Sequence, residues 1–163
     1  MKQLRIVQVV ATMLLFAMLN TPALAETRKA ALDGFHEVPA ISTTGHGEFR
    51  AQISSDETQI EIQLSYTDLE GSENLRAHIQ LGQPDVAAGI VIHLCGTRGK
   101  PPCPLPPALL TLTVTGADAV GLPTQGIAAG ELDEVIAAMR ARKTYVNVHN
   151  DTFPSGEIRG DIR

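Results

Sequence analysis

The sequence predicts an all-β fold, an antiparallel β-sandwich of about eight strands with one short amphipathic helix before a C-terminal hairpin. Residues 58–67 alternate apolar and polar side chains over their whole length, as a strand with one buried face does. Other short runs are rich in β-branched residues and are separated by Gly and Pro turns, which is typical of sandwiches and barrels. One stretch, residues 131–142, has helical periodicity instead.

The first 25 residues have the parts of a secretory signal peptide. Lys2 and Arg5 precede an apolar run, and the segment ends in Ala23-Leu-Ala25. A membrane anchor is the competing interpretation, but the apolar run is shorter than the roughly 20 residues that a spanning helix needs. We therefore expect residues 1–25 to be removed from an exported protein, periplasmic or secreted, with no membrane span after cleavage.

The remaining residues, 26–163, have the length of a single domain, and no linker divides them. The whole chain carries 13 Lys and Arg against 18 Asp and Glu, and the leader includes two of the cations. Binding to nucleic acid needs clustered Lys and Arg. This charge balance argues against a nucleic-acid partner.

The expected strands follow in order along this domain. Segments 49–53 and 58–67 are joined by Ser54-Ser-Asp-Glu57, a sequence suited to a hairpin turn. Two segments are richest in β-branched residues, as core strands would be, and they are 89–95 and 109–115. The other expected strands are 29–36, 75–81, 145–149 and 157–162, the last two being joined by a turn with Pro154 and Gly156.

Residues 131–142 are expected to form the helix. Leu132, Val135, Ile136 and Met139 are spaced so that they share one helical face. Acidic residues in the first turn and Arg in the last complement the helix dipole. The apolar stripe is narrow, so we expect it to cover the core of the sandwich and not a membrane or a partner helix.

The two cysteines, Cys95 and Cys103, are expected to form a disulfide. An even count at short separation is typical of a disulfide in an exported chain. A thiolate metal site or a redox pair would place the cysteines closer together, as in C-x-x-C. Closing a loop of somewhat fewer than 15 residues would stabilise the fold by less than about 3 kcal/mol.

Three motifs, in the same order, resemble those of the chordin-type (CHRD) domain family, and together they span residues 32–163. They are Gly34-Phe-His-Glu37-Val-Pro39, similar to the family's opening motif, Arg76-Ala-His78-Ile-Gln80, similar to its central Ala-His-Ile-His, and the closing Tyr145-Val-Asn-Val-His149 with Phe153-Pro-Ser-Gly156-Glu-Ile-Arg-Gly160. The resemblance implies an immunoglobulin-like or superoxide dismutase-like sandwich, of the free-standing exported bacterial type.

Alternation along two strands predicts a polar patch. His78 and Gln80 share one face of their strand, and Asn147 and His149 share one face of another, so neighbouring strands would bring the four together. With His93 as a third imidazole, His78 and His149 could bind zinc or copper. The alternative is structural, with each imidazole bonded to a backbone carbonyl or to a carboxylate such as Glu157. Gln80 stands where the family has a second histidine, and Gln is a poorer ligand for transition metals.

The last strand places Glu157 and Arg159 on one face, where Glu could act as a base and Arg could hold an anion. An ion pair of Arg159 with Glu37 or Asp161 is the structural alternative. The sequence has no G-x-S-x-G, no phosphate-binding loop and no H-E-x-x-H.

We therefore predict no catalytic residue. The predicted function is that of an exported, non-enzymatic binding or structural module with a protein partner. The predicted binding residues are His78, Gln80, Asn147, His149, Glu157 and Arg159. The alternative is a metal-binding protein in which His78, His93 and His149 hold copper or zinc, and no other cofactor is expected.

Overall fold

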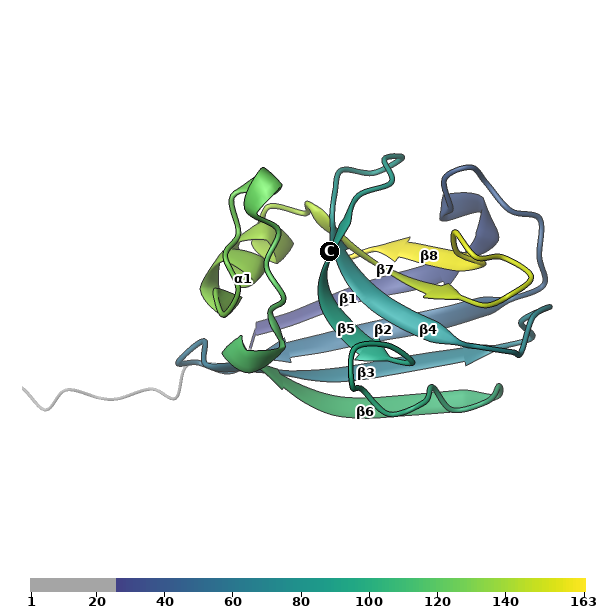
Figure 1. The fold of residues 1–163 in the computed structure, drawn as a ribbon, viewed down its shortest axis with the longest axis horizontal. Helices are drawn as coiled ribbons and strands as arrows, with labels where there is room; N and C mark the ends of the chain where they lie inside the picture. Colours follow the sequence, from purple (N-terminus) through teal and green to yellow (C-terminus); the bar gives the residue numbers. More distant parts are fainter. Residues whose placement is uncertain (1–25) are drawn as a thin grey trace, which may run out of the picture.

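The computed structural model describes residues 26–163, and the predicted signal peptide, residues 1–25, lies outside them. Eight strands form one nearly closed antiparallel sheet in the order β5-β4-β7-β8-β1-β2-β3-β6 (Figure 1). The strands are β1 (Glu26–Asp33), β2 (His46–Ile53), β3 (Gln59–Thr67), β4 (Arg76–Leu81), β5 (Gly89–Cys95), β6 (Ala108–Thr115), β7 (Thr144–His149) and β8 (Ile158–Asp161). The predicted all-β sandwich with about eight strands is confirmed.

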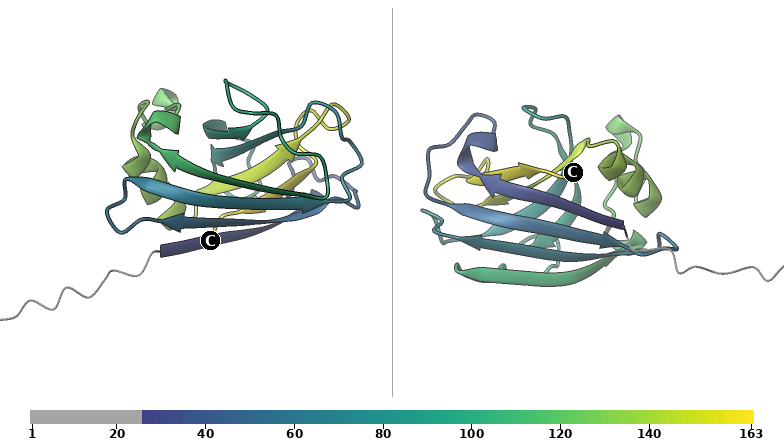
Figure 2. Two further views of the ribbon diagram at one scale, coloured as in Figure 1. Left: turned by 90° about the horizontal axis from the view of Figure 1, so that it is seen from below. Right: turned by 180° about the vertical axis from the view of Figure 1, so that it is seen from behind.

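The sheet folds into two layers that enclose the apolar core. Strands β1, β2, β3 and β6 form one layer, and β4, β5, β7 and β8 form the other (Figure 2). The alternation in β3 places Ile60, Ile62 and Leu64 in the core with no exposed surface. The turn between β2 and β3 is closed by Asp56, whose carboxylate accepts hydrogen bonds from the Ser54 and Thr58 hydroxyls at 2.7 and 2.9 Å.

The α-helix α1 (Leu132–Arg140) lies at one open end of the sandwich (Figure 1). Its buried residues are the four that the periodicity predicts: Leu132, Val135, Ile136 and Met139. The helix therefore covers the core, as expected from its narrow apolar stripe.

The first expected strand ends earlier than predicted. Strand β1 stops at Asp33, and the next three residues form the 3₁₀ turn η1 (Gly34–His36). The Asp33 side chain accepts a hydrogen bond from the backbone N–H of His36 at 3.1 Å, which caps the turn and ends the strand. The alternation of apolar residues gives no information about such a cap. The prediction that the strand continues through residues 34–36 was therefore wrong.

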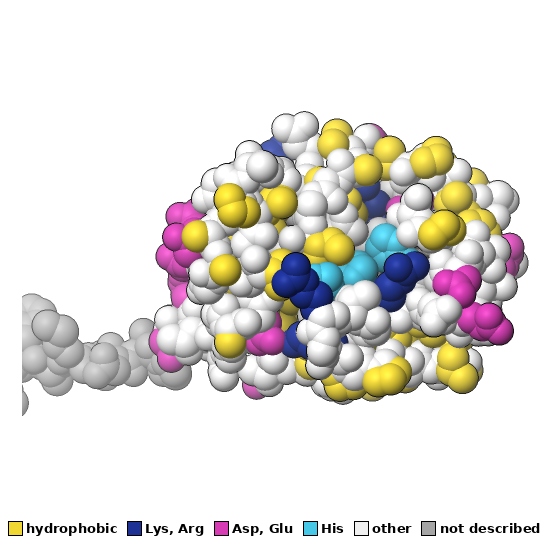
Figure 3. All heavy atoms as spheres, in the orientation of Figure 1, with side chains coloured by type: hydrophobic (Ala, Val, Ile, Leu, Met, Phe, Trp, Pro, Cys, Tyr) yellow, Lys and Arg dark blue, Asp and Glu magenta, His cyan; other side chains and the backbone are white. Residues whose placement is uncertain are grey.

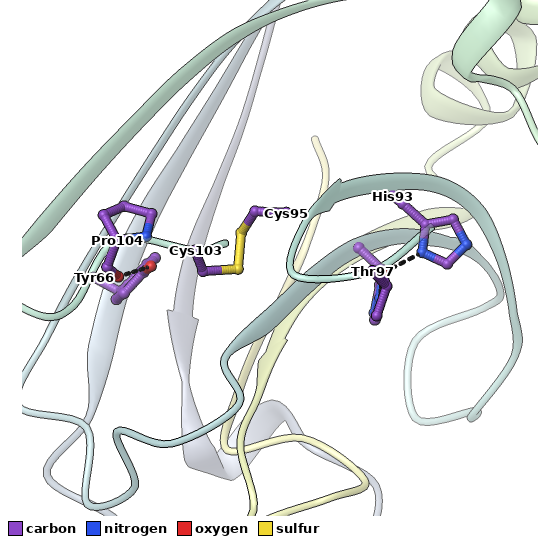
Figure 4. The surroundings of a disulfide bond; sticks show 7 residues. Tyr66, His93, Cys95, Thr97, Cys103 and Pro104 are labelled. Atoms are coloured by element: carbon purple, nitrogen blue, oxygen red, sulfur yellow. Dashed lines mark hydrogen bonds between the residues drawn. A yellow bond between two sulfur atoms is a disulfide. The ribbon is translucent and has the colours of Figure 1, made fainter. Parts of the chain in front are cut away.

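The predicted disulfide is confirmed. Cys95, the last residue of β5, is bonded to Cys103, with Cα atoms 4.9 Å apart (Figure 4). The loop between them turns back on itself, because the N–H of Gly96 donates to the carbonyl of Pro101 at 2.8 Å. This loop is thereby held beside β5, where it carries Thr97 to the histidines described below. Among the described residues, no helix is long and apolar enough to cross a membrane.

Candidate functional site

One row of polar side chains crosses four neighbouring strands. His93 in β5, His78 in β4, Asn147 in β7 and Arg159 in β8 are successive register partners. Their neighbours along the strands, such as Ala77 and Val148, belong to the core, so the polar residues lie on the outer face of the sheet. We call this outer surface, with its members His78, His93, His149, Gln80 and Asn147, the histidine face. Figure 3 shows histidine side chains at its centre and Lys or Arg side chains on both sides.

The three imidazoles of the histidine face are in contact. The ring of His78 packs edge-on against that of His93, with centroids 4.9 Å apart, and against that of His149 at 5.1 Å. The Thr97 hydroxyl lies 3.1 Å from His78 Nε2 and 2.7 Å from His93 Nδ1 (Figure 4). A hydroxyl has one proton to donate but can accept two hydrogen bonds, so at least one of these two ring nitrogens must donate to Thr97.

The third imidazole, His149, faces two oxygens that can only accept. Its Nε2 lies 3.0 Å from Asn147 Oδ1, and its Nδ1 lies 3.2 Å from the carbonyl of Pro154. A neutral ring can donate to one of them, whereas a protonated ring would donate to both. The predicted structural contact with a backbone carbonyl is therefore present, and Glu157 is not the partner of His149.

A directional chain of hydrogen bonds fixes the amides of the face. The N–H of Ala88 donates to the Tyr145 hydroxyl at 3.0 Å, and that hydroxyl donates to Gln80 Oε1 at 2.6 Å. Gln80 Nε2 then donates to Asn147 Oδ1 at 2.8 Å. Gln80, which replaces the second histidine of the family motif, is thus an internal link between Tyr145 and Asn147.

Burial keeps the three imidazoles uncharged. Burial, followed by smaller effects of the neighbouring His149, His93 and Arg76 side chains in the same direction, lowers the pKa of His78 to about 3. Burial is also the main cause of the lowered pKa of His93, followed by the charges of Arg98 and Lys100. The pKa of His149 is lowered by burial and by Arg76, against the opposing hydrogen bond to Pro154.

Glu37 and Arg159 are buried beside the face, and neither is more than 6% exposed. Burial raises the pKa of Glu37 to about 7, although the Arg159 charge and hydrogen bonds from Val38 and Asn147 act against it. Arg159 stacks on the Tyr145 ring, 3.4 Å from its centroid, and lies 3.8 Å from Asp161. The predicted ion pair of Arg159 with Asp161 is therefore present at the outer limit of such contacts.

Glu157 lies apart from the histidine face. It has no exposed surface, and its carboxylate accepts hydrogen bonds from Thr43, Glu70, Gly71 and Asn150. These donors come from the loops that join η1 to β2, β3 to β4 and β7 to β8. A ligand-binding role for Glu157 stays a prediction.

The sequence reasoning missed Tyr145, Arg76 and Thr97. Tyr145 shares the face of Asn147 and His149 by alternation, and Arg76 shares that of His78, so the pattern contained a signal for both. Thr97 lies in an irregular loop, where no periodicity applies, and only the disulfide indicates that the loop stays near β5.

The buried imidazoles make stability depend on pH. In the unfolded chain a histidine has a pKa near 6.5, whereas burial lowers the pKa of folded His78 to about 3. Between these two pH values the unfolded state binds more protons than the folded state. The free energy of unfolding therefore falls as the pH falls. The contribution of His78 is about 1.4 kcal/mol per pH unit, and we expect His78→Gln to remove it. Urea unfolding at several values between about pH 4 and pH 8 measures the slope.

Glu37→Gln should have the opposite effect to His78→Gln. Folded Glu37 binds a proton below about pH 7 and the unfolded residue only below 4.5, so wild-type Glu37 stabilises the fold at acidic pH. An unchanged slope in His78→Gln would show that His78 binds its proton at the same pH in the folded and unfolded states.

The fold and the site together describe a class of protein, a disulfide-bonded β-sandwich module with a polar patch on its outer face. The family model of the CHRD domain matches residues 28–162, so the chain belongs to the CHRD domain family. Membership supports a non-enzymatic binding or structural module in general terms. No curated protein and no solved structure matches the chain.

Proposed function

We propose that this protein is an exported, non-enzymatic binding module that holds an acidic partner protein on its histidine face. One observation carries the proposal: the uncharged imidazole of His78 packs against those of His93 and His149 on the outer face of the sheet, with cationic side chains on both sides (Figure 3). The cations that act on the imidazoles are Arg76, Arg98 and Lys100. The chain as a whole has a net charge of −5, so this face differs in sign from most of the surface.

Two of these cations have no carboxylate partner. Within residues 26–163, Arg76 and Arg98 form no salt bridge, while Lys100 lies 2.5 Å from Asp118. Guanidinium groups without an internal anion are suited to carboxylates of another protein. Export is supported by the leader-like residues 1–25 and by the disulfide, which persists in oxidising compartments.

An NMR titration with a hexaglutamate peptide tests this function. We expect shifts of the His78, His93 and His149 ring signals and of the Arg76 guanidinium, and weaker binding at high salt because exposed charges are screened. Hexalysine is the control peptide. Arg76→Gln should weaken binding several-fold, whereas Arg50→Gln on β2 should not. Shifts that avoid the histidine face, or that hexalysine reproduces, would contradict the proposal.

A metal centre made of His78, His93 and His149 is the second candidate function. One observation favours it: His78 Nε2 and His93 Nδ1 converge on a single point, now taken by the Thr97 hydroxyl. Uncharged imidazoles are also the form that binds metals. Against it, the neighbouring charges are positive, and in the described part of the chain no group of three His, Cys, Asp or Glu side chains is arranged to hold an ion.

Elemental analysis of protein purified from an oxidising compartment distinguishes the two candidates. A metal centre predicts near-stoichiometric zinc or copper that disappears in His149→Ala. It also predicts tighter zinc binding in Thr97→Ala, because the competing hydroxyl is removed. Metal-free protein that does not bind added zinc or copper would exclude the metal centre, leaving the peptide titration to decide on the binding module.

A further inference from the structure

A second candidate site lies outside the histidine face, beside the loop that joins β4 to β5. A cavity of about 530 Å³ lies between this loop, Gln125 and Lys143. Its size is within the range of small-molecule sites. Most of its lining side chains are apolar, namely Leu81, Val86, Ala87 and Ala88.

Val86 is unusual because it exposes an apolar side chain to solvent. It is 45% exposed, and it is one of four large hydrophobic residues with exposed side chains in the described part of the chain. Here the exposed side chain lines a cavity, so a ligand would remove apolar surface from water.

Hydrogen bonds from other parts of the fold hold the loop and its margin in place. Arg159 donates hydrogen bonds to the carbonyls of Val86 and Gln83 at 3.1 and 3.2 Å. The N–H of Ala88 donates to the Tyr145 hydroxyl, and Gln125 Nε2 donates to the carbonyl of Leu81 at 3.1 Å. The cavity is therefore formed before any ligand arrives, which lowers the entropy lost on binding.

Lys143 is the one charged residue that lines the cavity. Among residues 26–163 no carboxylate forms a salt bridge with it, and its side chain is exposed. An ammonium at the margin of an apolar cavity complements a ligand with an apolar body and one anionic end.

We infer that this cavity binds a small organic carboxylate with an apolar body, its chain against Val86, Ala87 and Ala88 and its carboxylate at Lys143. The inference is independent of the proposed function, because the two sites share no lining residue. Occupation of one site does not require the other.

Titration with octanoate, followed by NMR, tests the inference. We expect the amide signals of Gly82, Val86 and Ala88 to shift, with a dissociation constant on the order of 1 mM for so small a ligand. Octanol and octyltrimethylammonium have an apolar chain of similar length without the negative charge, and both should bind at least about 5-fold more weakly.

Two variants separate charge recognition from a folding defect. Lys143→Gln should weaken octanoate binding about 5-fold or more and leave octanol unchanged, while Lys29→Gln on β1 should change neither. Val86→Asp introduces a negative charge, of the same sign as the octanoate carboxylate, at an exposed position. It should abolish octanoate binding without lowering the melting temperature. Equal binding of octanoate and octanol, equal binding by Lys143→Gln, or no shift near the β4–β5 loop would overturn the inference.

Discussion

Replacing Arg159 by methionine is expected to lower the free energy of unfolding by about 3–5 kcal/mol. Arg159 is 1% exposed, and its guanidinium donates to the carbonyls of Gln83 and Val86. Methionine has a similar length but no donor, so these two carbonyls lose their side-chain donor and Asp161 keeps only Arg163. In a domain of this size the melting temperature should fall by roughly 10 °C or more, as measured by thermal denaturation.

Arg163→Met is the matched control for this prediction. The Arg163 side chain is 68% exposed and lies 3.7 Å from the same Asp161, so its loss should change stability by less than about 1 kcal/mol. The β4–β5 loop provides a second measurement, because its amides should exchange with solvent faster in Arg159→Met. Equal stability of the two variants would show that Arg159 does not hold the loop.

The strands were predictable because their side chains alternate. In β3 every apolar residue of the pattern is buried, and the α1 stripe is buried as its spacing predicts. Alternation also placed His78 with Gln80, and Asn147 with His149, on common faces. What it could not supply was the neighbour of each strand, because pairing between β4 and β7 joins segments that lie far apart in the sequence.

The contacts of the site depend on loops, and loops have no period. Thr97 reaches two imidazoles only because the disulfide holds its loop beside β5. Arg159 was expected to pair with carboxylates, yet its shortest hydrogen bonds are to backbone carbonyls of the β4–β5 loop. A buried guanidinium needs several acceptors, and sequence alone does not tell which loop provides them.

Replacing Glu157 by glutamine is expected to destabilise the fold by about 2–4 kcal/mol, although the side chain keeps its shape. Oε1 accepts hydrogen bonds from the Thr43 hydroxyl at 2.7 Å and from the N–H of Glu70 at 2.6 Å. Oε2 accepts from Gly71 N–H at 3.3 Å and from Asn150 Nδ2. Glutamine puts an NH₂ group in place of one carboxylate oxygen. The two groups that donated to that oxygen then face another donor and lose their acceptor.

Glu48→Gln on β2 makes the same chemical change at an exposed carboxylate and should alter stability by less than about 0.5 kcal/mol. Thr43→Val removes one of the four donors, and urea unfolding of the double variant with Glu157→Gln tests the geometry. If the new NH₂ group faces Thr43, the two losses should be less than additive, because the valine no longer leaves a hydroxyl without an acceptor. Full additivity would place the NH₂ group beside Asn150 instead. A loss below about 0.5 kcal/mol in Glu157→Gln would contradict a four-donor carboxylate that joins these loops.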